Sequence, residues 1–507
     1  MNTRKKKLIL NSISSLVYQL AVFASGLVLP RMFLRYYGSE VNGLVTSIGQ
    51  FLGVIMLAEC GVGSVVQSAL YKPLAEHDED AVSRIMISSE RFFRKIALIL
   101  AGYTALLVAA YPLLTLETFD YGYTMLLILL ISIRYFAQYY FGMSYKLLFL
   151  ADQRGYIQYT LHAGAHILNT LLCVLLMQRG ASVHLVKFAT SFVFLLQPLS
   201  LMLIARKRYR IDRSLVLTEE PLKQKWNGVA QHLALVAQEN TDTIILTLFA
   251  TLTDVSIYDV YHLVVVGIKQ IIVSFSDGMQ AMLGNMYARN ETETLNRTFD
   301  GIEWLLHFIV TVVFSAAAML ILPFIGIYTR DIADANYYVP TFAYMITLAM
   351  GVYCLRLPYY MMVLVAGHYK QTQRSAILEA AINIVVSTVL VFRYGIIGVA
   401  IGTFVAMAYR TGYLVWYLSG NILNRSVRHF LSHGAVDVLT AACIIALVRA
   451  LPGFFVLRGE SYGAWIALAL KVTVCAAAVG LAVNAACYRS KAVAALRMIA
   501  QKFKKKR

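Results

Sequence analysis

The sequence predicts an all-α polytopic membrane protein in which about fourteen transmembrane helices form two related six-helix lobes and two further C-terminal helices. Three observations lead to this fold class: the composition, the recurrence of long apolar runs, and residue matches at a constant spacing. Of the 507 residues, 59% are hydrophobic and only 14% are charged, whereas soluble proteins carry about 25% charged residues. The composition therefore excludes an ordinary soluble protein.

Apolar runs long enough to cross a bilayer, which takes about 20 helical residues, recur along the whole chain. We expect spans at residues 8–30, 43–70, 93–114, 121–143, 156–178, 182–204, 229–251, 257–284, 303–327, 340–366, 375–393, 397–419, 432–456 and 463–487. The first run follows four basic residues, as a signal peptide would, but it is too long and lacks a convincing cleavage site. We therefore assign it as the first span.

The basic residues are distributed unevenly between the two sides of the predicted membrane. The chain carries 45 Lys and Arg against 27 Asp and Glu, a net charge of +18. Most of the basic residues fall in alternate connections and in the two chain ends. By the positive-inside rule, both termini are expected in the cytoplasm. The net positive charge is then explained by the orientation of the chain in the membrane, and no nucleic-acid partner is predicted.

Residue matches at a constant spacing indicate an internal duplication. Asn169 in the fifth span recurs as Asn383 in the eleventh, and Gly180 recurs as Gly395, at offsets of 214 and 215 residues. Because six spans is an even number, both lobes share one orientation, and we expect an axis along the membrane normal to relate them. The predicted organisation is an N-lobe at 1–204, a basic linker at 205–228, a C-lobe at 229–419, two extra spans within 432–487 and a basic tail at 488–507.

Two pairs of glycines occur at the spacing that lets helices approach closely. Gly49 and Gly53 lie four residues apart in the second span, and Gly398 and Gly402 lie four apart in the twelfth. Small residues at this spacing commonly form helix interfaces. We expect packing sites rather than functional sites at both pairs.

Ionisable side chains inside the spans are the candidate substrate residues, because a charge that faces lipid costs several kcal/mol and usually faces a cavity instead. Glu239 and Asp242 stand three residues apart and share one face of the seventh span. Arg356 lies two residues before Pro358, and we expect a bend there because proline removes a helical hydrogen bond. The cavity candidates are Glu59, Glu239, Asp242, Lys269, Asp277, Arg356 and Glu379.

Structural roles remain open for some charges inside the spans. Lys269 and Asp277 are eight residues apart on roughly one helix face, which also suits a buried structural network. A further group is expected to lie near span ends or to reach the interface by long stems, and is not assigned to the site: Arg134, Lys187, Asp259, Arg410 and Lys471. We expect Asp242 and Arg356 to face one aqueous cavity between the lobes.

No catalytic or metal-binding constellation is predicted. The six cysteines form no CxxC pair, and His162 and His166, although four residues apart, have no third ligand nearby in the sequence. The chain has no nucleotide-binding motif and no nucleophile triad pattern. Its connections are also too short to hold a catalytic domain. We therefore predict a protein that is not an enzyme and has no cofactor.

The chain resembles the Wzx-type polysaccharide flippases of the multidrug/oligosaccharidyl-lipid/polysaccharide (MOP) exporter superfamily. The likeness rests on Tyr37 to Leu44, Leu57 to Gly63, Asn240 to Asp242, Val255 to Tyr258 and Arg356 to Tyr359. It covers essentially the whole chain, and the fourteen spans are shared with the lipid II flippase branch. The resemblance implies a MATE-like pair of lobes around a central cationic cavity.

The resemblance also implies a substrate and a location. The expected function is the movement of an undecaprenyl-pyrophosphate-linked oligosaccharide, a surface polysaccharide precursor, to the outer leaflet of the bacterial cytoplasmic membrane by alternating access. Coupling to a proton or sodium gradient is implied too, and we expect a monomer. Arg356 and Lys269 suit the pyrophosphate, and the carboxylates suit sugar hydroxyls or coupling protons.

Two other functions remain open. A cation-coupled drug or metabolite exporter of the same superfamily shares the lobes but favours an acidic, aromatic pocket. A membrane-embedded glycan polymerase or transferase belongs to a different class. The two extra spans and the mixed-sign interior disfavour the first alternative, and the missing catalytic loop disfavours the second.

Overall fold

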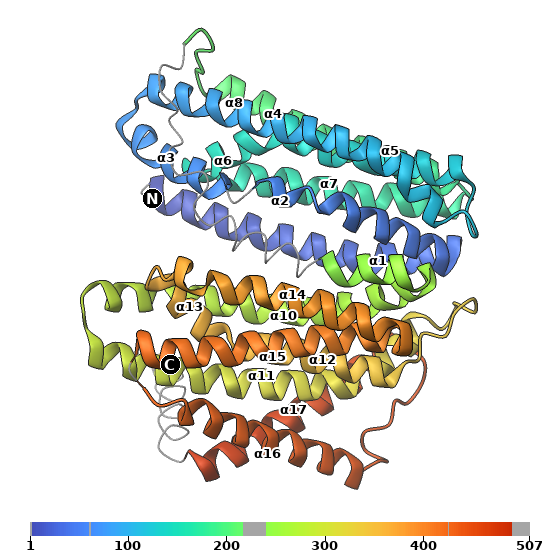
Figure 1. Cartoon of the computed structure of the whole chain (residues 1–507), viewed down its shortest axis with the longest axis vertical. Coiled ribbons are helices and arrows are strands. Elements are labelled where there is room, and N and C mark those ends of the chain that lie inside the picture. Colours follow the sequence, from blue (N-terminus) through green and yellow to red (C-terminus); the bar gives the residue numbers. More distant parts are fainter. Residues whose placement is uncertain (1–2, 60–61, 216–239, 424, 489–507) are drawn as a thin grey trace. The chain divides into compact units, whose positions relative to one another are not determined.

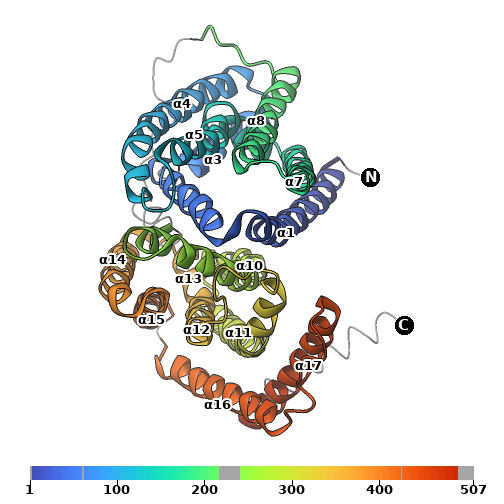
Figure 2. The ribbon, with the colours of Figure 1, turned by 90° about the vertical axis from the view of Figure 1, so that its right-hand side faces the viewer.

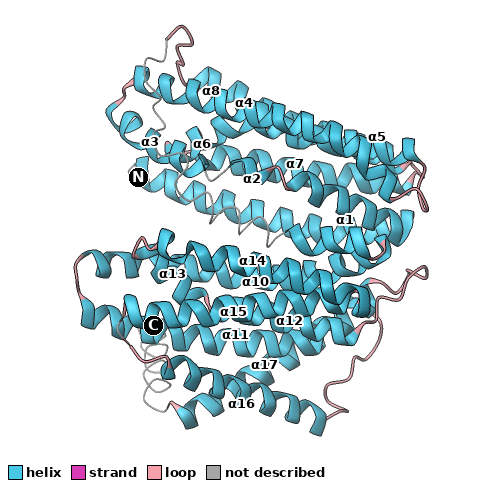
Figure 3. Cartoon of the chain, in the orientation of Figure 1, coloured by secondary structure: helices cyan, strands magenta, loops and turns pink. Residues whose placement is uncertain are grey.

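The computed structural model describes residues 3–59, 62–215, 240–423 and 425–488, and the structural statements below concern these residues. Every regular element among them is a helix, as the sequence predicts (Figure 3). Twelve helices in the described part are long and apolar enough to cross a membrane. The chain is thus a multi-pass membrane protein, and it divides into two compact units, Met1–Ser256 and Ile257–Arg507.

Two local features explain why twelve helices correspond to fourteen predicted spans. Helix α1 (Thr3–Gly53) holds the first span and the start of the second, joined through non-helical backbone at Gly38 with φ 82° and ψ 174°. Glycine adopts this conformation readily because it has no Cβ. The second span then continues through α2 (Met56–Glu59) and α3 (Val62–Glu76). The seventh predicted span lies partly outside the described residues, which resume at residue 240.

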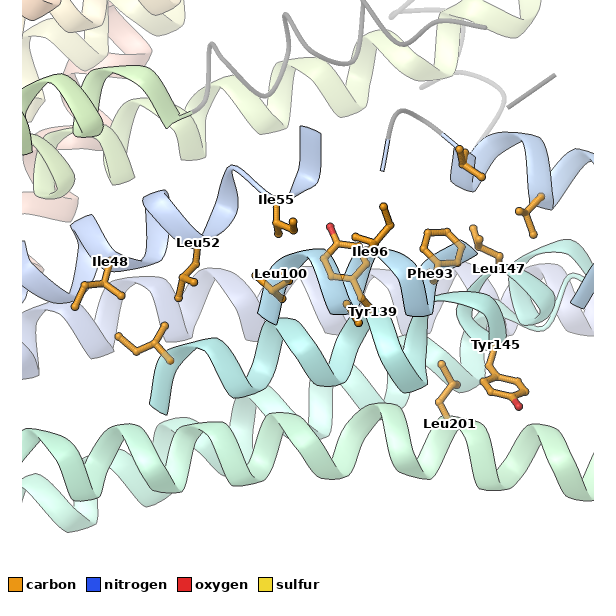
Figure 4. Packing of buried hydrophobic residues seen from close by; sticks show 14 of the residues in the cluster. Ile48, Leu52, Ile55, Phe93, Ile96, Leu100, Tyr139, Tyr145, Leu147 and Leu201 are labelled. Atoms are coloured by element: carbon orange, nitrogen blue, oxygen red, sulfur yellow. The ribbon is translucent and has the colours of Figure 1, made fainter. Parts of the chain in front are cut away.

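The other helices of the first unit run alongside α1 (Figure 1). They are α4 (Glu79–Ala110), η1 (Tyr111–Leu114), α5 (Tyr121–Ala137), η2 (Gln138–Gly142), α6 (Met143–Ala151), α7 (Gly155–Gln178) and α8 (Val183–Arg208). Helix α1 packs on α7, and α5 and α7 pack on α8. Their buried faces form one apolar core, whose members include Ile48 and Leu52 of α1 and Leu100 of α4 (Figure 4).

The second unit contains α10 (Leu252–Ala288), whose first turn belongs to the first unit, and seven further helices. These are α11 (Thr292–Tyr328), α12 (Pro340–Leu355), α13 (Leu357–Val365), α14 (Tyr369–Tyr394), α15 (Ile396–Asn421), α16 (Arg428–Ala450) and α17 (Tyr462–Cys487). Helix α15 packs on α12 and α14, whereas α16 and α17 pack on each other and on α11 (Figure 2).

Several helices extend beyond the predicted apolar runs. Helix α4 begins at Glu79 instead of residue 93, and α11 begins at Thr292 instead of residue 303. Hydropathy marks the part of a helix that lies in lipid, whereas the helical hydrogen bonds continue through charged turns. The start of α4 is set by Asp78, whose side chain accepts a hydrogen bond from the Ala81 N–H at 2.8 Å, as an N-cap residue does.

The helix positions follow the repeat found in the sequence. Helix α7 begins at Gly155 and α14 begins 214 residues later, at Tyr369. Inside the first unit, Asn42 Nδ2 donates a hydrogen bond to Ser256 Oγ at 2.9 Å, and these residues are also 214 apart. Two segments that correspond in the repeat are therefore in contact there. The contact is close, because a Cβ on Gly43 would lie 1.8 Å from the Leu252 carbonyl oxygen.

The two glycine pairs differ in how closely they pack. A Cβ on Gly398 would lie 2.3 Å from the Leu390 carbonyl oxygen, and one on Gly402 would lie 2.1 Å from Ser387 Oγ. This confirms the expected close approach, which joins α15 to α14. A Cβ on Gly49 would meet only the Tyr135 hydroxyl, at 4.0 Å. A Cβ on Gly53 would lie 2.9 Å from Asn240 Oδ1. The expected close approach is therefore confirmed at Gly53, whereas Gly49 is at ordinary contact distance from its neighbour.

Candidate substrate site

The tenth predicted span is broken at Arg356. Helix α12 ends at Leu355 and α13 begins at Leu357, with Pro358 as its second residue. Proline lacks the N–H that would continue the helical hydrogen bonds, and its ring clashes with the carbonyl group four residues earlier. The helix is thus interrupted beside this charge, where the proline predicts a disturbance. The interruption places Arg356, which is 6% exposed, at the junction of two helices.

Two arginines share one carboxylate in the second unit. Arg356 Nη1 donates a hydrogen bond to Glu379 Oε1 at 2.5 Å, and Arg410 Nε lies 3.7 Å from Glu379 Oε2. Each of the three residues is buried. We refer to Arg356, Glu379 and Arg410 as the arginine cluster. Because it holds two guanidinium groups and one carboxylate, the cluster has a net charge of +1.

The location of Arg410 corrects the expectation that its stem reaches the membrane interface. Its side chain is 3% exposed, and Nη1 donates hydrogen bonds to the Thr372 carbonyl oxygen at 2.9 Å and to the Ser375 hydroxyl. These partners on α14 satisfy the guanidinium inside the unit. The sequence carried a signal for this placement. Glu379 lies ten residues after the start of α14, and Arg410 lies eleven residues before the end of α15. Because the two helices are consecutive and pack on each other, these positions lie at about the same depth in the membrane.

A tyrosine ring brings Lys269 next to the arginine cluster. The Arg356 guanidinium carbon lies 4.3 Å from the centre of the Tyr353 ring, and Lys269 Nζ lies 5.0 Å from the same centre. Cations at such distances are attracted by the ring quadrupole. The structure thus brings together three of the predicted residues: Lys269, Arg356 and Glu379. Asp277 lies in the same helix as Lys269, α10, but its side chain is outside the described part.

The remaining predicted residues belong to the first unit. Asp242 is buried, with 4% exposure, in a described segment that packs on α1 through the hydrogen bond between Ser47 and Thr247 at 2.6 Å. Glu59 is half-buried at the end of α2 and lies close to Tyr139. Glu239 lies outside the described residues. That Asp242 and Arg356 share one cavity stays a prediction.

A pocket of about 720 Å³ opens in the first unit, away from the predicted residues. It is lined by Glu79, Asp80, Ser83, Arg206, Tyr209, Arg210, Ile211, Asp212 and Arg213. Hydrogen bonds from the Ser214 hydroxyl and N–H hold the pKa of the Asp212 carboxyl below its usual range. The three acidic and three basic lining residues balance in charge, unlike the arginine cluster. We do not assign this pocket to the substrate.

Comparison with known proteins identifies the fold. No protein-family model and no curated protein sequence matches the chain. Among solved structures, the lipid II flippase MurJ in an inward closed conformation superposes with a TM-score of 0.71 at 14% identity, covering 95% of this chain and 99% of the flippase. An inward-facing multidrug resistance MATE family transporter of the MOP superfamily gives 0.61 at 16% identity, covering 81% and 97%.

A second MATE structure, in complex with MaL6, gives a TM-score of 0.53 at 15% identity, covering 82% of this chain and 97% of that one. At identities this low, a superposition shows the fold and leaves the activity to other observations. The chain therefore has the all-α fold that MurJ and MATE transporters share. The fold class predicted from the sequence is confirmed.

Proposed function

We propose that this chain is a flippase that moves an undecaprenyl-pyrophosphate-linked oligosaccharide from the cytoplasmic to the outer leaflet of a bacterial cytoplasmic membrane by alternating access. The observation that carries the proposal is the arginine cluster, which holds a buried excess of positive charge in a chain with a transporter fold. Because Glu379 can neutralise only one of the two guanidinium groups, the second positive charge is costly to bury. An anionic substrate would supply the missing negative charge.

The chemistry of the cluster suits a pyrophosphate. Guanidinium groups form paired, charge-assisted hydrogen bonds with phosphate oxygens, and Lys269 adds a third cation beside Tyr353. The carboxylates of Glu59 and Asp242, in the first unit, suit sugar hydroxyls, which donate hydrogen bonds to carboxylate oxygens. Coupling to a proton or sodium gradient and a monomeric state belong to the same proposal.

The coverage of the superpositions also supports a flippase over a drug exporter. The MurJ structure covers 95% of this chain, whereas the two MATE structures cover 81% and 82%. A larger covered share of this chain is expected for the flippase if α16 and α17 have counterparts in the flippase and none in the MATE structures. A cationic drug would in addition be repelled by the net charge of the arginine cluster, which disfavours export of that class of substrate.

Purified protein in lipid vesicles tests the proposal directly. A fluorescent lipid carrying a pyrophosphate-linked oligosaccharide should move between leaflets at a rate well above that of protein-free vesicles, and a cationic dye should not be transported. Arg356→Ala and Asp242→Asn should each reduce this rate at least tenfold while the protein inserts normally. The matched control is Arg393→Gln, on the exposed face of α14. Transport of the dye in place of the lipid would refute the proposal.

A further inference from the structure

A column of polar side chains lies along the contact between α11, a helix of the C-lobe, and α16, the first of the two helices that follow the lobes. Its members on α11 are Asp300, Glu303, His307 and Thr311, and those on α16 are His433, Asp437 and Thr440. We call this column the α11–α16 seam. Spacings of three and four residues place the members of each helix on one face. Helices that only needed to pack would meet through apolar residues at lower cost.

The inner end of the seam is built around Asp437. His307 Nδ1 lies 2.5 Å from Asp437 Oδ2, and Thr311 Oγ1 donates a hydrogen bond to Asp437 Oδ1 at 2.7 Å. The ring of His433 lies 5.2 Å from the ring of His307. An ionised carboxylate only accepts hydrogen bonds. With Asp437 ionised, the short contact requires a proton on His307 Nδ1.

The outer end of the seam is built around Glu303, which is fully buried. Arg425 Nη2 donates a hydrogen bond to Glu303 Oε2 at 2.6 Å and lies 3.7 Å from Asp300 Oδ1. The Tyr359 hydroxyl donates to the other Glu303 oxygen. Ligand atoms of Asp300, Glu303 and His433 all lie within 4.8 Å of one another. A carboxylate, an imidazole and a guanidinium thus share one buried space.

The charges in the seam balance only when protons are bound. It contains three carboxylates, on Asp300, Glu303 and Asp437, against the one guanidinium of Arg425. The titratable groups packed around these residues include Tyr359 and Tyr488, which are neutral at ordinary pH, and α17 contributes the uncharged Asn484. With both histidines neutral, the seam has a net charge of −2. A proton on each histidine brings it to zero.

Two buried polar atoms in the seam are free to take part in this binding. His307 Nε2 and Thr440 Oγ1 make no hydrogen bond among the described residues, and the two residues are only 2% and 1% exposed. Because His307 Nδ1 already carries a proton, a second proton on this ring would reside on Nε2. An uncompensated buried polar atom is costly. The Nε2 atom is therefore available to a bound proton.

The seam is most exposed at Asp300, which gives protons an entrance. The Asp300 side chain is 33% exposed, whereas that of Glu303 is fully buried and that of Asp437 is 15% exposed. Asp300 lies near the start of α11, at the helix end that carries the basic connection with Arg425. The seam therefore opens at the end of the helices that the charge distribution assigns to the cytoplasm.

Beyond Thr311, α11, α16 and α17 meet in an apolar cluster that does not depend on charge. Val312 and Leu320 of α11 pack with Ile444 of α16 and Val472 of α17 in one buried cluster. This cluster lies on the far side of Thr311 from Asp300. It holds the helix pair on α11 in any protonation state. A change in the seam would therefore act on only one end of the contact.

We propose that the α11–α16 seam is a proton-binding site, and that loss of its protons weakens the contact between α11 and α16 at the end where the seam opens. On the function proposed above, this is where a proton gradient would act on transport. Arg425 favours protons over a metal ion, because its guanidinium already lies between Glu303 and Asp300. The seam shares no residue with the arginine cluster, because its members lie on α11 and α16 and those of the cluster lie at Arg356 and on α14 and α15.

The first test compares thermal unfolding of the purified chain in lipid nanodiscs between about pH 6 and about pH 8.5. If the folded seam binds more protons than the unfolded chain, linkage requires stability to fall as pH rises. The wild type should lose several degrees of Tm over this range. His307→Gln/His433→Gln should lose clearly less, since glutamine cannot take up a proton. His429→Gln, an exposed histidine on the same helix, is the matched control and should behave as the wild type.

Hydrogen exchange of the wild type provides a second measurement if the double variant does not fold. After correction for intrinsic exchange, amides of residues 428–440 should lose protection at high pH while those of α7 do not. Equal pH dependence of Tm in the wild type and a folded double variant would overturn the proposal. So would uniform protection of 428–440 at both pH values. A Tm gain from added Mg²⁺ or Zn²⁺ that the double variant lacks, without a difference in pH dependence, would assign the seam to a metal instead.

These measurements separate the seam from the proposed function, because neither requires transport. If the lipid-linked oligosaccharide is not moved under any condition, the function fails and the unfolding data still decide the seam. If it is moved, an imposed pH gradient should change the rate at least several-fold in the wild type and in His429→Gln. The same gradient effect in the folded double variant would overturn the coupling role.

Discussion

Replacing Glu379 should destabilise the protein more than replacing Arg356, although the two residues form one ion pair. Arg356 Nη1 and Glu379 Oε1 are 2.5 Å apart, and Arg410 lies 3.7 Å from the other carboxylate oxygen. At an effective dielectric constant near 20, each attraction amounts to about 4 kcal/mol, and two cations on opposite sides of one carboxylate repel each other by about 2 kcal/mol. The two substitutions should therefore differ in their cost in folding stability, because Glu379 makes two attractions whereas Arg356 makes one attraction and one repulsion.

Arg356→Gln removes one attraction and the repulsion, and leaves a neutral pair of Glu379 and Arg410. Its electrostatic cost is therefore about 2 kcal/mol, before the relief of desolvation that comes with one charge fewer. Glu379→Gln removes both attractions and leaves two buried guanidiniums without a counter-charge. Breaking a buried pair in this way costs about 3–5 kcal/mol. The double variant Arg356→Gln/Glu379→Gln should be more stable than Glu379→Gln alone.

Fluorescence-detected unfolding in detergent, together with membrane abundance, measures this order. Glu379→Gln should show the lowest Tm and abundance, the double variant an intermediate value, and Arg356→Gln a value near the wild type. Arg393→Gln, on the exposed face of α14, controls for the loss of a positive charge. An Arg356→Gln variant less stable than Glu379→Gln would refute the reasoning. It would mean that the second guanidinium does not raise the energy of the folded state.

Two further outcomes follow from the packing and from the charge distribution. Gly402→Ala should cost about 1–3 kcal/mol, because the new Cβ would lie 2.1 Å from Ser387 Oγ and 2.7 Å from its backbone nitrogen. Gly412→Ala on the same helix, with no atom within 4 Å, should be neutral or stabilising by up to about 1 kcal/mol, and equal thermal stabilities of the two variants would contradict the close-packing argument. Reporter fusions at the two termini should both be active only when the reporter is cytoplasmic, and an external C-terminus would overturn the predicted topology.

The seam and Arg410 show where sequence reasoning was incomplete. Glu303, His307, His433 and Asp437 all fall inside predicted spans, at spacings that place each pair on one helix face. Such spacing identifies the face of a helix but not the helix that covers it. The pairing of α11 with α16 joins segments about 130 residues apart, as the contact between His307 and Asp437 shows. No local pattern encodes that pairing.

The sequence alone determined the properties that depend on the composition of single segments. Apolar runs fix where helices cross the bilayer, because every buried backbone group must be hydrogen-bonded within its own segment. Pro358 fixes the break at Arg356, because the missing N–H is a covalent property. The repeat offset of 214 residues is carried by the chain itself, and the starts of α7 and α14 reproduce it.

The tertiary structure decided which charges neutralise each other. Both Arg410 and Glu379 are readable in the sequence, but whether a long guanidinium stem reaches the interface or turns inward depends on what lies beside it. Close packing of α14 on α15 at Gly402 brings the Thr372 carbonyl and the Glu379 carboxylate within reach of Arg410. Because electrostatic energy depends on distance and burial, the net charge of the cluster is a property of the packed helices.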